Sequence, residues 1–447
     1  MQVPWWRKLP VWLIAFALCA GAGLLQSMSV DWTRPLTIYD EVPHIDYVFR
    51  LADGSLTTWD DVYSQRTLGI ADCLEAMSDN PQCVTGQLRD PQERWPNGHS
   101  YEALQAPVGY LPFVVADVLT IDNGGDHYSQ IRQLRLVNTG LWVIFAGAWA
   151  LLIAQVTSRR LAAAAASVAV AVNPLLFDRF TYVTNDGTAI ITATAISAWL
   201  LFTLRRPPPT WWGWLLPALL AGLVIGSLKP TALIVLPVIV LAVWATGRFV
   251  SSTYPPKGWW IAVLVSGGMG SLVAITYAAY INSLSKLDYV TVFSVIQPRG
   301  PLDFATASLL RIEDVSEVVT GSGARTNQML FDWGVRSPST WILAFTLVTA
   351  AAFMVSLTVR SSTFDRSDSL DHRALGLAVL AGFIAILIAL PALHYVRGEF
   401  LLPFTSGRFQ ATLIPLAGLA MLPAFARFRI WASVIVLAGV GIAAFAS

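Results

Sequence analysis

Apolar runs of about twenty residues recur along most of this chain, and they constrain its fold more than any other feature. A helix needs a run of about that length to cross a bilayer core about 30 Å thick. The 447 residues are 55% hydrophobic and 13% charged, with a mean hydropathy of +0.58, whereas soluble domains carry about 25% charged residues. The sequence therefore predicts an all-α polytopic membrane protein, with one transmembrane domain over residues 1–447. No basic run and no aromatic RNA-binding motif appears, so nucleic acid is not expected as a partner.

About eleven segments are predicted as transmembrane helices. They are 11–29, 136–156, 161–180, 186–204, 212–228, 231–247, 259–281, 340–359, 373–394, 408–424 and 430–446. The first has no clean small-x-small cleavage site after it and is expected to remain as an uncleaved helix. Every proposed cytoplasmic turn is basic, as the positive-inside rule requires, and of the 28 acidic residues only Asp365, Asp368 and Asp371 fall there. We predict a multi-pass membrane protein with a cytoplasmic N-terminus and an extracytoplasmic C-terminus.

Two long segments remain for the outer face, residues 31–135 and 282–340. Within the first, Pro107 to Leu119 is apolar but too short to cross, which favours an interfacial or re-entrant helix on the outer leaflet. Cys73 and Cys83 lie in the same loop. Two cysteines close together in an oxidising compartment favour a disulfide, with a pair of free thiols as the alternative.

Acidic residues follow the first predicted helix. Asp40 and Glu41 are adjacent, and His44 comes one helical turn later. Such a group near the membrane could supply a general base. The alternative is a solvated acidic turn.

A second polar group precedes the interfacial segment. Glu102 and Gln105 are three residues apart and would share one face of a helix, and Tyr110 follows. A capping feature before an apolar helix explains the same residues equally well.

Several cations and amides fall near the outer rim. Arg135, Lys229 and Arg408 lie at the outer ends of predicted helices, where the positive-inside rule disfavours them, and Asn185 with Asp186 ends another outer turn. Arginine and lysine at such places could hold a phosphate. The alternative for each is snorkelling to lipid headgroups.

In their order along the chain, these residues resemble the motifs of the GT-C superfamily of membrane glycosyltransferases, which take sugar from a polyprenyl-phosphate donor. The chain is similar in particular to bacterial membrane proteins related to aminoarabinose transferase and protein mannosyltransferases. This resemblance implies the bacterial inner membrane as its location. Asp40-Glu41 resembles the Asp-Glu pair of their first outer loop. The stretch Glu102–Tyr110 is similar to their Gln-Pro-Pro-Leu-Tyr-Tyr motif, although Ala106 stands where the commoner pattern has its first proline.

Three further steps of the chain extend the resemblance. Arg135-Leu136 resembles the family's Arg-Leu step into the second helix, and Asn185-Asp186 resembles its Asn-Asp turn. Gly407-Arg408-Phe409 is similar to a late Gly-Arg-Tyr motif. The resemblance implies a GT-C-like fold whose two large extracytoplasmic loops carry juxtamembrane helices. No large soluble domain follows the last predicted helix, so acceptor binding would use the two outer loops.

The resemblance also implies an inverting transfer of sugar from a polyprenyl-phosphate donor to a cell-envelope glycan, lipid or protein on the outer face, with membrane lipids as the other partners. The phosphate leaves as an anion, so one carboxylate base is sufficient. Asp40 is the expected base, with Glu41 as the alternative, and His44 or Glu102 would orient the acceptor.

The remaining polar residues receive their roles from the same resemblance. The donor phosphate would be held by Arg408 and Lys229, with Arg135 behind them. Substrate would be positioned by Gln105, Tyr110, Asn185 and Asp186. No cofactor is predicted: some members of the superfamily use a divalent metal, but the acidic cluster here lacks a second obvious set of ligands.

Two other classes of protein share parts of this pattern. A lipid-linked sugar transporter or flippase would have a similar number of helices, but it should show inverted repeats and ionisable residues near the bilayer midplane. Neither is evident in the sequence. A non-catalytic scaffold for envelope assembly is the third interpretation, and it predicts that Asp40→Ala is silent.

Overall fold

The computed structural model describes most of the chain. It covers residues 9–28, 30, 36, 41–76, 98–100, 102–122, 127–173, 176–177, 179–249, 255–287, 349–358, 364–365, 370–396 and 410–445, with the backbone alone for 72–76, 127–128, 387–396 and 443–445.

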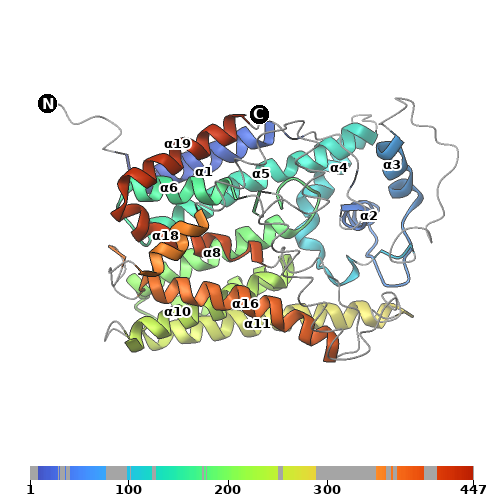
Figure 1. The fold of residues 1–447 in the computed structure, drawn as a ribbon. Coiled ribbons are helices and arrows are strands. Elements are labelled where there is room, and N and C mark those ends of the chain that lie inside the picture. Colours follow the sequence, from blue (N-terminus) through green and yellow to red (C-terminus); the bar gives the residue numbers. More distant parts are fainter. Residues whose placement is uncertain are drawn as a thin grey trace.

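Within these residues the protein is a bundle of apolar helices. The bundle consists of α1 (Val11–Met28), α5 (His127–Ala154), α6 (Arg160–Ala171), α8 (Asp186–Arg205), α9 (Trp212–Leu228), α10 (Val235–Phe249), α11 (Lys257–Leu284), α16 (His372–Val396), α18 (Ile414–Arg427) and α19 (Arg429–Phe445). Most of these helices lie side by side with their axes roughly aligned (Figure 1). The described residues form no sheet, and their β features are isolated bridge positions, one of which pairs Val62 with His99.

The predicted spans coincide with helices. Five helices of the described residues are long and apolar enough to cross a membrane: Val11–Met28, Ser129–Ala154, Asp186–Arg205, Pro230–Phe249 and Lys257–Leu284. Shorter apolar helices occupy the other predicted segments, including Thr349–Thr358. The all-helical class and the apolar helices are therefore confirmed for the described residues, while the number of crossings stays a prediction.

One predicted span differs from the observed helix. The sequence predicts one helix over 161–180, but α6 ends at Ala171. Pro174 follows closely in the sequence, and helices usually end at or before the residue that precedes a proline. Asn173 lies just after the helix, and its side chain accepts a hydrogen bond from the backbone N–H of Leu176 at 3.2 Å.

Short helices from residues 31–135, the predicted first outer loop, gather at one end of the bundle. They are α2 (Glu41–Ala52), α3 (Gln65–Ala76), the 3-10 helices η3 (Glu102–Leu104) and η4 (Pro107–Tyr110), and α4 (Leu111–Asp122). α2 and α3 lie at the right-hand end in Figure 1. The apolar segment after Pro107 is indeed a short helix, and Leu111, Val115 and Leu119 on α4 are each more than half exposed. The position of this helix at the outer leaflet stays a prediction.

The first outer loop is fastened to the end of α11. The indole Nε1 of Trp59 donates to Asn282 Oδ1 at 2.9 Å. The carboxylate of Asp60 accepts from the backbone N–H groups of Lys286 and Leu287, both at 2.7 Å. The two outer segments therefore meet where the second one begins. Cys83 and the side chain of Cys73 lie outside the described residues, so their disulfide stays a prediction.

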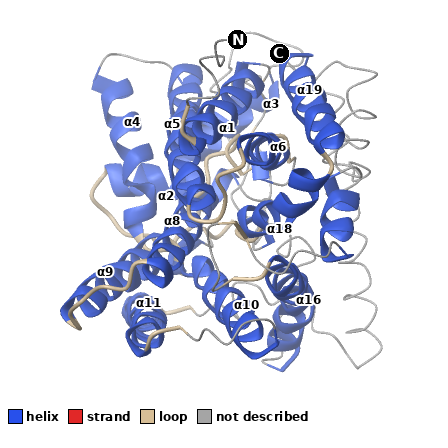
Figure 2. Ribbon diagram, turned by 90° about the vertical axis from the view of Figure 1, so that its left-hand side faces the viewer, coloured by secondary structure: helices blue, strands red, loops and turns tan. Residues whose placement is uncertain are grey.

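Small residues let α9 and α11 pack closely, as the two adjacent helices in Figure 2 show. A Cβ atom on Gly222 would lie 2.8 Å from the carbonyl oxygen of Ser266, and one on Gly226 would lie 2.7 Å from that of Gly270. Glycines four residues apart on an apolar helix are typical of such close contacts. Here the pair serves packing within the bundle.

Candidate functional site

Polar side chains meet where the outer-loop helices join the bundle. Glu41 begins α2, and Arg135 lies on α5. The guanidinium of Arg135 donates two hydrogen bonds to the carboxylate of Glu41, from Nε to Oε1 at 2.8 Å and from an Nη to Oε2 at 2.7 Å. Both side chains are fully buried. A paired fork of this kind compensates two charges that would be costly alone.

A second cluster lies one helical turn further along α2. His44 Nδ1 lies 2.5 Å from the hydroxyl of Tyr110 and 3.5 Å from Glu102 Oε2. The same hydroxyl donates to Glu102 Oε2 at 3.4 Å. All three side chains are buried. They come from α2, η3 and η4, so the fold joins the two polar groups that the sequence places in separate stretches.

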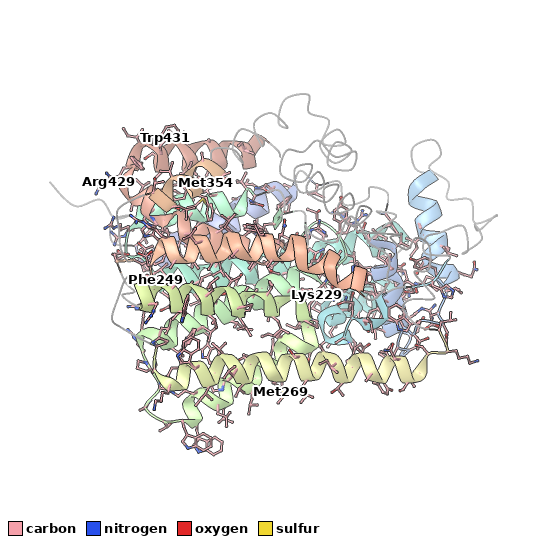
Figure 3. All side chains as sticks on the ribbon, turned by 60° about the horizontal axis from the view of Figure 1, so that its bottom comes forward. Lys229, Phe249, Met269, Met354, Arg429 and Trp431 are labelled. Atoms are coloured by element: carbon pink, nitrogen blue, oxygen red, sulfur yellow. The ribbon has the colours of Figure 1, made fainter. Side chains whose placement is uncertain are left out.

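Lys229 owes its inward position to the proline that follows it. Pro230 restricts the preceding residue to extended geometry, and Lys229 has φ −160° and ψ 117° between α9 and η5 (Pro230–Ile234). Its ammonium donates to Asn185 Oδ1 at 2.6 Å and to the carboxylate of Asp186. Lys229 is 2% exposed, and in Figure 3 it lies near the end of α10, beside the outer-loop helices.

Asn185 departs from the usual role of its position. It stands at the N-cap of α8, where asparagine commonly caps the helix with its side chain, yet it makes no such hydrogen bond. Its amide instead accepts from Lys229 and donates to Gln105 Oε1 at 3.1 Å. Asp186 also faces Arg179, with Oδ2 and Nη1 3.5 Å apart. This side-chain use favours a functional role for the turn.

Gln105 connects the loop to the bundle. Its carbonyl oxygen accepts from the hydroxyl of Tyr47 at 2.6 Å, and that hydroxyl also lies 2.9 Å from the hydroxyl of Tyr277 on α11. Burial raises the pKa of Tyr47 above its ordinary value, which keeps the hydroxyl protonated as a donor. Gly109 allows η4 to approach the end of α9 closely, because a Cβ on Gly109 would lie 2.8 Å from the carbonyl oxygen of Leu228.

The fold therefore gathers most of the residues singled out in the sequence. The described members of that set are Glu41, His44, Glu102, Gln105, Tyr110, Arg135, Asn185, Asp186 and Lys229, and each contacts at least one other member. Asp40 and Arg408 lie outside the described residues. The sequence predicts Glu102 and Gln105 on one helical face, but η3 ends at Leu104, before Gln105, and the two side chains engage different partners, Tyr110 and Asn185.

Four neighbours of these residues do not stand out in the sequence. Tyr47 lies in the predicted outer loop and Tyr277 in the predicted span 259–281, and the sequence distinguishes neither from the many other aromatic residues. Arg179 lies inside the predicted span 161–180, where its charge is itself a signal against a continuous helix. Asn138 follows the Arg-Leu step into the second helix, and its side chain donates to the carbonyl oxygen of Tyr182 at 2.5 Å. No group of three histidine, cysteine or acidic side chains able to hold a metal ion occurs in the described part of the chain.

Comparison with known proteins bears on the fold. No family model matches the sequence, and no curated protein matches it. The structure is similar to a crystal structure of the oligosaccharyltransferase of Archaeoglobus fulgidus, tethered by a disulfide to an acceptor peptide with the NVT sequon. The TM-score is 0.50 at 12% identity, over 97% of this chain and 54% of the other, so this chain spans about half the length of that protein. The likeness is one of fold, and at that level it agrees with the GT-C-like architecture expected from the motifs.

Proposed function

We propose that this protein is an inverting membrane glycosyltransferase, which moves a sugar from a polyprenyl-phosphate donor to a cell-envelope acceptor on the outer face of the membrane. The observation that carries the proposal is that the described motif residues gather in buried polar groups where the outer loop meets the bundle. The fold likeness to an oligosaccharyltransferase supports the same class of enzyme.

The proposed reaction is a single displacement. The acceptor hydroxyl attacks the anomeric carbon, its proton passes to the carboxylate of Asp40, and the bond from the anomeric carbon to the phosphate oxygen breaks. The polyprenyl phosphate leaves as an anion, so no general acid is needed for its departure. Attack opposite the leaving group inverts the anomeric centre. Cations at the departing phosphate stabilise the charge that develops on it.

Roles for the other residues follow from this scheme. Lys229 and Arg408 would hold the donor phosphate, with Arg135 behind them. His44 and Glu102, joined through Tyr110, would orient the acceptor. Lys229 is held by Asn185 and Asp186, so a phosphate that binds there meets a cation with a fixed direction. Gln105 extends this arrangement to the outer loop.

The deciding experiment measures transfer of radiolabelled sugar from polyprenyl-phosphate donors in proteoliposomes, with wild type compared with Asp40→Asn. Transfer by the wild type that the isosteric change abolishes, at unchanged expression and folding, is the expected result. Equal transfer by both would remove Asp40 as base. Movement of the lipid across the bilayer without sugar transfer would show that the protein is a flippase and not a glycosyltransferase.

A further inference from the structure

We infer that Glu41 is a positioning residue: together with Asn138 it clamps the peptide group between Tyr182 and Val183, and this clamp sets the turn that presents Asn185 and Asp186 to Lys229. The effect on catalysis rests on the proposed function, whereas the clamp itself is a property of the fold. The inference separates Glu41 from Asp40, its neighbour in the sequence.

The surroundings of Glu41 are unfavourable for a general base. Each of its oxygens accepts a hydrogen bond from the guanidinium of Arg135, and both side chains are fully buried. Proton uptake by Glu41 would leave the buried cation of Arg135 facing a neutral group. The pair is therefore most stable with Glu41 ionised throughout a reaction cycle.

The same carboxylate holds one side of a peptide group. Glu41 Oε1 accepts from the backbone N–H of Val183 at 3.1 Å. The carbonyl of that peptide group belongs to Tyr182 and accepts from Asn138 Nδ2 at 2.5 Å. Both polar atoms of a single peptide unit are thus bound by side chains. Rotating the unit would break both hydrogen bonds and turn its carbonyl oxygen toward the carboxylate.

α5 carries the two side chains that hold this clamp in place. Arg135 and Asn138 are three residues apart on this helix, so they lie on one face. Arg135 fixes Glu41 and Asn138 fixes the carbonyl. Glu41 and Asn138 are both fully buried, which removes competition from water and makes each hydrogen bond costly to lose.

The clamped peptide lies immediately before the ligands of Lys229. The chain between Arg179 and Asn185 forms turns and bends rather than helix, so no helical hydrogen-bond pattern fixes its path. Asn185 and Asp186 follow within three residues of Val183, and both bind the ammonium of Lys229. Arg179 at the other end of the turn faces Asp186. A shift of the clamped peptide would move both partners of Lys229 together.

Kinetics distinguish positioning from base catalysis. We compare Glu41→Gln, Asn138→Ala and the double variant for sugar transfer in proteoliposomes over a range of donor concentrations and pH. In either orientation the side-chain amide of Glu41→Gln places an N–H against Arg135, which breaks the paired hydrogen bonds that hold residue 41 against Val183. Each single variant should raise the KM for the donor about tenfold, as expected for one lost buried hydrogen bond, with the pH profile of kcat unchanged. The double variant should add little, because both substitutions free the same peptide.

Two results would overturn the inference. One is a fall in kcat of about a thousandfold or more in Glu41→Gln, with an unchanged KM and a silent Asn138→Ala, which would make Glu41 catalytic. The other is a double variant whose effects multiply. If Glu41→Gln does not fold, Asn138→Ala alone must still raise the donor KM, since it leaves the pair of Glu41 and Arg135 intact.

Thermal stability tests the clamp even if the wild type transfers no sugar from any donor, because it does not depend on activity. Melting temperatures of the purified protein in detergent give a double-mutant cycle between Glu41 and Asn138. Non-additive losses support the clamp, and additive losses contradict it. Asn282→Ala is the matched control: it also loses a side-chain hydrogen bond, to Trp59, but away from the clamp. Its effect should add to that of Glu41→Gln.

Discussion

The ammonium of Lys229 lies 2.6 Å from Oδ1 of Asn185, and the amide nitrogen of Asn185 lies 3.1 Å from Oε1 of Gln105. One asparagine thus joins a buried cation at the break between two bundle helices to a residue of the outer loop. This relationship links the bundle directly to the loop across their junction.

Replacing Lys229 with methionine should destabilise the protein. The change leaves Asp186 buried without its nearest cation, and breaking a buried pair from one side costs roughly 3 kcal/mol. Asp186→Asn should destabilise the protein to a comparable extent, because it leaves the buried charge of Lys229 without its carboxylate partner. The double variant should be more stable than the sum of the two losses allows, because it contains neither charge. Melting temperatures in detergent measure all three, and strictly additive losses would contradict the pairing.

Removing the hydroxyl of Tyr110 should weaken both folding and the proposed transfer. Tyr110→Phe deletes the group between His44 and Glu102, and an unsatisfied buried partner costs about 1–2 kcal/mol of stability. We expect transfer to fall about tenfold, since acceptor orientation depends on these side chains. Tyr280→Phe, half exposed on α11, is the matched control and should behave as wild type. Equal transfer by both variants would exclude a role for the Tyr110 hydroxyl.

The positions in the cluster could be predicted from the sequence far better than their pairings. Polar residues such as Lys229 and Asn185 stand out because an apolar chain retains charges only for a reason, and the fold does bring them together. Glu41 and Arg135 are 94 residues apart, and no local pattern shows that they meet. Whether Glu41 acts as a base or as part of an ion pair depends on that meeting. Arg179 does carry a signal, its charge inside a predicted span, but averaging hydropathy over the whole span masks one charge near its end.

The carboxyl group of Asp117 should make stability depend on pH. Burial raises the pKa of Asp117 above its ordinary value, although the Arg66 guanidinium, 2.7 Å away, opposes the rise. Because the folded state then binds the proton more readily than the unfolded state, stability falls as pH rises from about 3.8 through the folded pKa. The stability of the wild type relative to Asp117→Asn should therefore fall as pH rises across that window. Melting temperatures between about pH 4 and about pH 7 measure the difference. A constant difference would show that the pKa of Asp117 does not change on folding.

Close packing of α9 on α11 predicts opposite effects for two glycines. A Cβ on Gly226 would lie 2.6 Å from Cβ of Val273 and 2.7 Å from the carbonyl oxygen of Gly270, so the helices must move apart. Gly226→Ala should cost about 1–3 kcal/mol, as overpacking does. Gly268 lies on α11 with nothing within 4 Å of its Cβ position. Gly268→Ala should therefore be neutral, or stabilising by up to about 1 kcal/mol through helix propensity.

The two glycine variants add the same methyl group to neighbouring helices, so the comparison isolates the helix contact. Melting temperatures in detergent should fall for Gly226→Ala and hold or rise for Gly268→Ala. If both fell equally, the loss would come from a general intolerance of these helices to change rather than from their contact. If neither fell, α9 and α11 would have to lie further apart than the 2.7 Å approach to Gly270 allows. That would also loosen the position of Lys229, which follows α9 directly.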